Sequence, residues 1–428
     1  MEQTSIKPNG WALLPILVFL VLFLGSGIVL NDFYTMPAVV GFLIALIVAF
    51  AQNRQRTFAD KLKTIAEGVG DENIITMCLI FLSAGAFSGA VSAAGGVDST
   101  VNLGLSLLPP SIAVIGLFII GCFISLSMGT SMGTIAALAP IAVGISDKTG
   151  FALAICIGAV VSGAMFGDNL SMISDTTIAA VRTQGCNMND KFKKNFFIVL
   201  PAAIITVIIL ALLTAGSTYK LNANLDYNIL QVIPYILVLI AALIGINVFI
   251  VLISGTVLSV IVGLATGSMA VADIFTSIGT GVNGMYDITV ISILVACIGA
   301  LVKENGGFAF ILSIVKSRVH TYRGAELGLA ALISCTDAAT ANNTVAIVIA
   351  GPIAKEISDE FDIEPARSAS ILDIFASVFQ GIIPYGAQLL SAATLTGLTP
   401  FMIMPYLFYP YLMAVSALIS ILLPRRKK

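Results

Sequence analysis

The sequence predicts an all-α, multi-pass membrane protein built from two inverted-topology repeats that contain broken helices and hairpin helices, either re-entrant or spanning. Three observations lead to this prediction: long apolar runs, basic residues gathered on one side, and a set of motifs that occurs twice. Of the 428 residues, 58% are hydrophobic and 10% are charged, with a mean hydropathy of +1.03. Soluble domains carry about 25% charged residues. We therefore expect the chain to lie in a lipid bilayer. We expect no nucleic acid as a partner.

Apolar runs long enough to cross about 30 Å of hydrocarbon recur along the whole chain. The first, residues 11–30, is too long for a signal peptide and is followed at once by a second run. The runs divide the chain into two N-terminal helices, a first repeat, an outer loop with two linking helices, and a second repeat with a basic tail. The corresponding ranges are 1–57, 58–214, 215–270 and 271–428.

The positions of the basic residues orient the chain. If the N-terminus is cytoplasmic, all but two of the 21 Lys and Arg residues fall on the cytoplasmic side, as the positive-inside rule requires. The exceptions are Lys148 and Lys220. We therefore expect both termini in the cytoplasm, in a prokaryotic inner membrane.

The two repeats are recognised by paired landmarks. Ala59 and Asp60 precede a Gly-x-Gly as Ala272 and Asp273 do, and the segments 133–147 and 343–359 match around a central proline. In the charge-derived topology the two copies have opposite orientation. Each begins with an amphipathic segment, 58–70 or 271–284, which we expect to lie in the membrane interface.

In each repeat, a polar cluster interrupts one apolar run. The next predicted helix of the repeat is interrupted as well. The polar clusters are residues 127–134 and 334–344, and the later interruptions are 166–171 and 380–388. Non-helical backbone at membrane depth persists only where it is buried by protein or lines a cavity. We therefore expect two hairpin tips that face two broken helices, with binding sites near the membrane midplane.

Three aspartates define the predicted chemistry. A carboxylate at the bilayer centre costs about 2.5 to 3.5 kcal/mol, so Asp168, Asp175 and Asp337 need a partner or a function. The sequence indicates no Lys or Arg at comparable depth. A buried carboxylate without a basic partner is neutralised by a proton or by a bound cation, and this competition is the chemistry of antiport. Asp373 is expected near a helix end, in contact with solvent.

The run from Phe166 to Thr177 resembles the NhaC-type sodium/proton antiporter family, whose signature is F-G-D-x-x-S-P-[IL]-S-D-T-T. Here Met172 replaces the proline, and Asn169 stands where other members often carry His or Lys. The resemblance covers nearly the whole chain. It implies the ion-transporter superfamily architecture: a scaffold domain that forms a homodimer and a transport domain with two hairpins that moves as an elevator. The family also includes malate/lactate exchangers and amino-acid permeases.

The sequence thus favours a sodium/proton antiporter in which a midplane carboxylate alternately holds Na⁺ and H⁺. The alternative is a Na⁺- or H⁺-coupled transporter of a small amino acid or organic acid. No cofactor is expected, because Na⁺ and H⁺ are the transported or coupling ions. A sodium site is predicted at Asp168, Thr130 and Ser171. The full set of candidate binding residues is Asp168, Asn169, Ser171, Asp175, Thr130, Ser131, Thr134, Asp337, Thr340, Asn342, Asn343, Thr344 and Gln388.

Two other classes of protein are disfavoured. A membrane aspartyl protease pairs a Tyr-Asp with a later Gly-x-Gly-Asp, but here Tyr286 and Asp287 follow Gly167 and Asp168. A channel is disfavoured because inverted repeats with broken helices are typical of alternating access and not of a continuous pore.

Overall fold

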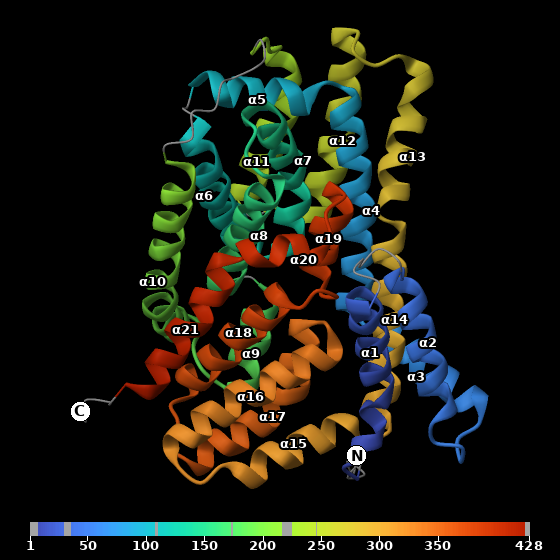
Figure 1. The fold of residues 1–428 in the computed structure, drawn as a ribbon, viewed down its shortest axis with the longest axis vertical. Helices are drawn as coiled ribbons and strands as arrows, with labels where there is room; N and C mark the ends of the chain where they lie inside the picture. Colours follow the sequence, from blue (N-terminus) through green and yellow to red (C-terminus); the bar gives the residue numbers. More distant parts are fainter. Residues whose placement is uncertain are drawn as a thin grey trace.

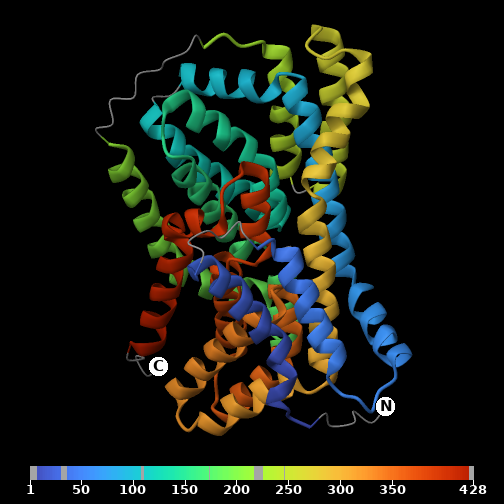
Figure 2. The same ribbon diagram turned by 45° about the vertical axis from the view of Figure 1, so that its right-hand side comes forward.

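The computed structural model describes residues 7–29, 36–107, 110–172, 174–215, 225–244 and 246–423, and every regular element within these ranges is a helix. Lys220 of the predicted outer loop and the basic tail at 425–428 lie outside the described residues. Figures 1 and 2 show the arrangement from two sides. The helices are η1 (Gly10–Leu13), α1 (Leu14–Val29), α2 (Ala38–Ala51), α3 (Phe58–Val69), α4 (Glu72–Ala93), α5 (Gly96–Leu107), α6 (Pro110–Met128), α7 (Ser131–Thr149), α8 (Leu153–Leu170), α9 (Asp175–Gln184), α10 (Met188–Thr214), α11 (Ile229–Leu243), α12 (Val248–Thr266), η2 (Val271–Asp273), α13 (Ile274–Gly284), α14 (Tyr286–Glu304), α15 (Gly307–Arg318), α16 (Tyr322–Thr340), α17 (Asn343–Glu360), α18 (Pro365–Ile382), α19 (Ala387–Thr396), α20 (Pro400–Ile403), η3 (Met404–Tyr406) and α21 (Phe408–Leu422).

The chain is a multi-pass membrane protein. In the part of the chain that the structure describes, six helical stretches are long and apolar enough to cross a membrane, and a bent pair would make a seventh. The two stretches that contain the predicted breaks, Leu153–Gln184 and Pro365–Thr396, are the most buried of the six. The predicted interruptions therefore lie in helices that are covered by protein.

The predicted hairpins and broken helices are present. In the first half, α6 and α7 form a hairpin, and α8 is separated from α9 by a short non-helical link. In the second half, α16 and α17 form a hairpin, and α18 is separated from α19 in the same way. Figure 1 places the α6–α7 hairpin in the upper half of the molecule and the α16–α17 hairpin in the lower half.

Glycines bring the last turns of α8 against α6. A Cβ added at Gly163 would overlap the carbonyl oxygen of Phe118, and one at Gly167 would overlap that of Cys122. Small residues of this kind allow membrane helices to approach backbone to backbone. The contact fixes the end of α8, where Asp168 stands, against the helix that leads into the first hairpin tip.

The two segments expected to lie in the membrane interface are both helical. The first, α3, begins with a capping box at Thr57 and packs along α14, and its interfacial position stays a prediction. The second, α13, continues with α14 in the apolar stretch Val271–Glu304, which is long enough to cross a membrane. Its interfacial position therefore stays a prediction as well.

Glycines bring α13 close against α4. It runs along α4, and a Cβ at Gly281 would overlap the carbonyl oxygen of Gly85 in that helix. Figure 2 shows α4 and α13 side by side along one edge of the molecule. Small residues at such a crossing let two helices approach backbone to backbone.

Candidate functional site

The first hairpin tip is a tight turn between α6 and α7. Gly129 adopts φ +69°, the left-handed conformation that glycine accepts without a steric penalty. Thr130 then caps α7: its backbone is extended, and its hydroxyl accepts from the backbone N–H of Gly133 at 3.4 Å. The turn makes Ser131 the first residue of α7, so its N–H has no partner within that helix and can donate to another element.

Asp168, in the last turn of α8, accepts from Ser131. Its Oδ2 accepts from the Ser131 hydroxyl at 2.7 Å and from the Ser131 backbone N–H at 3.3 Å. Its Oδ1 accepts from the hydroxyl of Ser174, in the link before α9, at 2.6 Å. The carboxylate is 5% exposed and lies at the N-terminal end of α7, where the helix dipole favours negative charge. Asp168 therefore joins the first tip to the first helix break.

The second hairpin tip carries the other buried carboxylate. Ala341 adopts φ +48° between α16 and α17, and Asn342 caps α17 by accepting from the N–H of Val345 at 3.0 Å. Asp337, one turn earlier, is fully buried. Its Oδ2 has no hydrogen-bond partner among the described residues.

Two glutamines connect the tips. Gln388, in the first turn of α19, donates to the Ser131 hydroxyl at 3.0 Å, and the Gln380 amide donates to the Gln388 side-chain oxygen at 2.6 Å. Gln380 also donates to the carbonyl of Ala341 at 3.3 Å, and with its amide flipped it would donate to Asp337 at 3.1 Å. A chain of polar contacts thus runs from Asp168 to the second tip. Sequence reasoning missed Gln380 and Ser174 as site residues, although Gln380 lies in the predicted break 380–388 and Ser174 in the motif run 166–177.

The other predicted residues of the tips and breaks are engaged mainly with backbone or with their own neighbours. The hydroxyls of Thr134 and Thr340 donate to the carbonyls of Thr130 and Thr336 in their own hairpins. The backbone N–H of Ser171 donates to the carbonyl of Gly167 and so ends α8, and the N–H of Thr344 donates to the Asn343 side chain.

Asp175 lies apart from the other aspartate of its motif. It is the first residue of α9, and its side chain is exposed, whereas Asp168 is buried at the end of α8. The structure therefore does not bring Asp175 into the site around Asp168.

Next to Asp168 lies a second polar cluster, of which sequence reasoning predicted only Asn169. Asn169 is fully buried: its side chain donates to Ser377 at 3.3 Å, and its Oδ1 accepts from Asn195 at 3.0 Å. Lys191 and Asp373 form an ion pair beside it, with side chains 1% and 0% exposed.

This pair corrects two expectations. The charge distribution predicts Lys191 on the cytoplasmic side, in the basic segment with Arg182, Lys193 and Lys194, and the sequence predicts Asp373 near a solvated helix end. It therefore indicates no basic residue at the depth of the aspartates. In the structure Lys191 lies within α10 and Asp373 within α18, and both are buried. The partners are 182 residues apart in the chain. An ion pair between two distant helices leaves no signal in local sequence.

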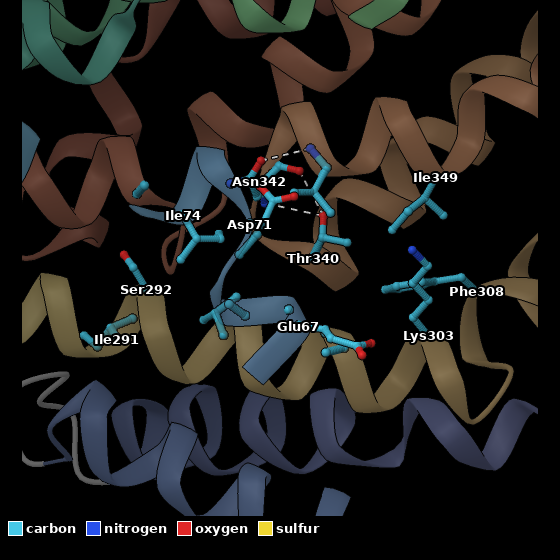
Figure 3. Close-up of a pocket in the computed structure, with 18 of the residues that line it drawn as sticks. Glu67, Asp71, Ile74, Ile291, Ser292, Lys303, Phe308, Thr340, Asn342 and Ile349 are labelled. Atoms are coloured by element: carbon cyan, nitrogen blue, oxygen red, sulfur yellow. Dashed lines mark hydrogen bonds between the residues drawn. The ribbon is translucent and has the colours of Figure 1, made fainter. Parts of the chain in front are cut away.

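A cavity of about 300 Å³ opens beside the second tip. Figure 3 shows Thr340 and Asn342 of the tip at this cavity, with Asp71, Glu67 and Lys303 among the other lining residues. Its walls come mainly from α3, α4 and α14 on one side, and from the second hairpin and α19 on the other. The cavity therefore lies at the second tip, where the chain of polar contacts that begins at Asp168 ends.

Comparison with known proteins identifies one family across the chain. A family model described as "Na+/H+ antiporter family" matches residues 5–215 and 220–424. The malate-2H⁺/Na⁺-lactate antiporter of Bacillus subtilis (strain 168) is 22% identical over 433 residues, covering 94% of this chain and 92% of the relative.

Two further relatives are named for different activities. The Na⁺/H⁺ antiporter NhaC of Alkalihalophilus pseudofirmus is 23% identical, covering 94% of this chain and 93% of the relative. The arginine/ornithine antiporter ArcD of Halobacterium salinarum is 23% identical, covering 96% of this chain and 91% of the relative. All three are transporters and not enzymes.

Proposed function

The chain belongs to the Na⁺/H⁺ antiporter family, and on that premise we propose that it exchanges Na⁺ for H⁺ at Asp168. The single observation that carries the proposal is the oxygen set around this carboxylate. Asp168 is buried and is contacted by the hydroxyls of Ser131 and Ser174, from the first tip and the first helix break. Na⁺ and H⁺ are transported ions here, not cofactors.

The same oxygens suit either ion. With Asp168 ionised, each hydroxyl donates to it, as observed. A hydroxyl also carries two lone pairs and its hydrogen rotates, so both serines can turn their oxygens toward a cation beside the carboxylate. A proton on Asp168 removes the negative charge that Na⁺ needs. One carboxylate therefore holds the two ions alternately, which is the requirement for exchange.

The proposed ligand set differs in part from the one expected from the sequence. Ser131 replaces Thr130 as the first ligand after Asp168, because the Thr130 hydroxyl caps α7. Ser171, which directly follows α8, stays a candidate ligand together with Ser174.

The proposal extends to the architecture. We propose that the two hairpins with their broken helices form inverted repeats and a transport domain that moves as an elevator, within a homodimer in an inner membrane and with cytoplasmic termini. The repeated order of hairpin and broken helix supports the repeats, and the resemblance of the sequence supports the rest. The cavity beside the second tip would then be the cytoplasmic entry route, and its Glu67 and Asp71 would attract cations.

The test uses purified protein in proteoliposomes. Adding Na⁺ outside should drive H⁺ movement in the wild type and not in Asp168→Asn, because asparagine cannot exchange a proton. Asp98→Asn is the matched control, since Asp98 is an exposed carboxylate on α5, paired with Lys148 at 3.5 Å. Undiminished flux in Asp168→Asn, at equal insertion, would remove Asp168 from the mechanism and move the proposal to Asp337.

A second candidate function is coupled transport of a small amino acid or organic acid. The observation that favours it is the amide-rich link between the tips, where Gln380 contacts Gln388 and Asn342 lines the cavity. Amides can donate to a carboxylate and accept from an amine. The same proteoliposomes, given malate, lactate, arginine and ornithine gradients in turn, separate the two functions: solute-dependent Na⁺ or H⁺ movement would favour the second.

A further inference from the structure

Lys191 is the basic residue next to the proposed ion site. Its ammonium donates to the Asn169 carbonyl at 3.0 Å, to the Thr177 hydroxyl at 2.9 Å and to the Asp373 carboxylate. All three of its hydrogens therefore have acceptors. These acceptors come from the end of α8, from α9 and from α18, so one side chain of α10 ties both broken helices together.

Two side chains of α10 donate hydrogen bonds to the end of α8, just before the helix break. The carbonyl of Asn169 is one of the last four of α8, which have no partner within their own helix. It accepts from both Lys191 and Asn195, each at 3.0 Å. A cation at this C-terminal end also interacts favourably with the helix dipole. Lys191 thus stabilises the turn of α8 that carries Asp168, one residue earlier.

The charges form a group of three. Lys191 donates both to the Asp373 carboxylate and to the carbonyl of Asn169, the residue after Asp168, so both carboxylates lie near one ammonium, which offsets one of their charges. The group as a whole carries a single negative charge when both carboxylates are ionised. One monovalent cation, either Na⁺ or H⁺, makes it neutral.

We propose that Lys191 and Asp373 are positioning residues that set the cation affinity of Asp168 through this charge balance. The inference rests on the proposed function and adds to it a determinant of affinity. It explains why an ion pair is kept in the core, where apolar residues of the same size would often be at least as stable. Together with Asp168, the pair gives the group a single negative charge, which one monovalent cation neutralises.

The experiment measures ²²Na⁺ binding to purified protein in detergent, with the wild type and every variant at the same pH. Asp373→Asn preserves size and brings the group to zero net charge, so Na⁺ affinity should fall by about tenfold or more. Adding Lys191→Met restores a single negative charge, and the double variant should return to within a few-fold of wild-type affinity. Lys191→Met alone should bind Na⁺ at least as tightly as the wild type.

A merely structural pair predicts a different pattern. Folded Lys191→Met would then bind Na⁺ more weakly than the wild type, or the folded double variant would not regain affinity; either result overturns the inference. The double variant also covers the case in which Lys191→Met alone does not fold, because it removes both members of the pair. If the wild type itself binds no Na⁺, the proposed function fails as well. If Asp168→Asn abolishes binding but the charge variants do not follow the pattern, only this inference fails.

Discussion

Ser131 occupies the point where two parts of the site meet. Its hydroxyl donates to Asp168 at 2.7 Å and accepts from Gln388 at 3.0 Å, whereas the hydroxyl of Ser174 contacts Asp168 and Thr176. Removing the Ser131 hydroxyl therefore affects both the carboxylate and the link between the tips.

We predict that Ser131→Ala raises the KM for Na⁺ by about 5- to 30-fold, as expected for the loss of a hydroxyl ligand that contributes about 1 to 2 kcal/mol to cation binding. Ser174→Ala should have a smaller effect in the same direction. The measurement is the initial rate of H⁺ flux against Na⁺ concentration in proteoliposomes.

Ser83→Ala is the matched control. Ser83 is also buried, but its hydroxyl donates to the carbonyl of Ile80 in its own helix at 3.1 Å. Its KM should equal that of the wild type. A similar rise in KM for Ser83→Ala would mean that loss of a buried hydroxyl, and not the position of Ser131, causes the effect.

At the scale of single residues, the burial of Asp168 and Asp337 could be predicted, but their contacts could not. Both aspartates stand where polar residues interrupt a long apolar run, and Asp168 also belongs to a motif. Lys191 was missed because it stands three residues after Met188, where α10 begins, and Lys193 and Lys194 follow closely. The segment thus has the composition of a basic surface loop. Only the packing of α10 against α18 shows that the Lys191 side chain turns inward.

At the scale of elements, the crossing of α4 and α13 offers the sharpest test. We predict that Gly281→Ala destabilises the protein by about 1 to 3 kcal/mol, because the new methyl group would overlap the Gly85 carbonyl oxygen and the backbone would have to shift. The measurement is thermal unfolding in detergent, followed by circular dichroism.

Gly279→Ala is the control on the same helix. A Cβ at Gly279 meets nothing within 4 Å, and alanine favours helix over glycine by up to about 1 kcal/mol. This variant should be as stable as the wild type or more stable. Equal loss of stability in both variants would show that helix α13 tolerates no substitution, and that the close crossing is not the cause.

The helices and hairpins themselves could be predicted because they follow local rules: run length, a glycine at the first turn, and capping residues at the tips. The packing of α13 against α4 could not be predicted in this way. Contacts such as that of Gly281 with Gly85 join segments far apart in the chain, and they depend on the absence of side chains, which gives no periodic signal.

For the whole molecule, the distribution of basic residues predicts the orientation. We predict that a cysteine placed at Lys148 reacts with a membrane-impermeant maleimide added from outside, and that cysteines placed at Lys193 and Arg323 react only after the membrane is opened. The six native cysteines are first replaced, since Cys335 is exposed. Labelling of position 193 from outside would contradict both the orientation and the inversion of the repeats.

The glutamine link between the hairpin tips differs in kind from the ion pair behind them. Ser131, Gln388 and Gln380 are neutral, so water can replace each of their hydrogen bonds without exposing an unpaired charge. Separating Lys191 from Asp373 would strand two charges in the core, at a cost of several kcal/mol. Breaking the hydrogen bonds between the two tips therefore costs less than separating the ion pair, so local fluctuations should part the tips more often than they part α10 from α18.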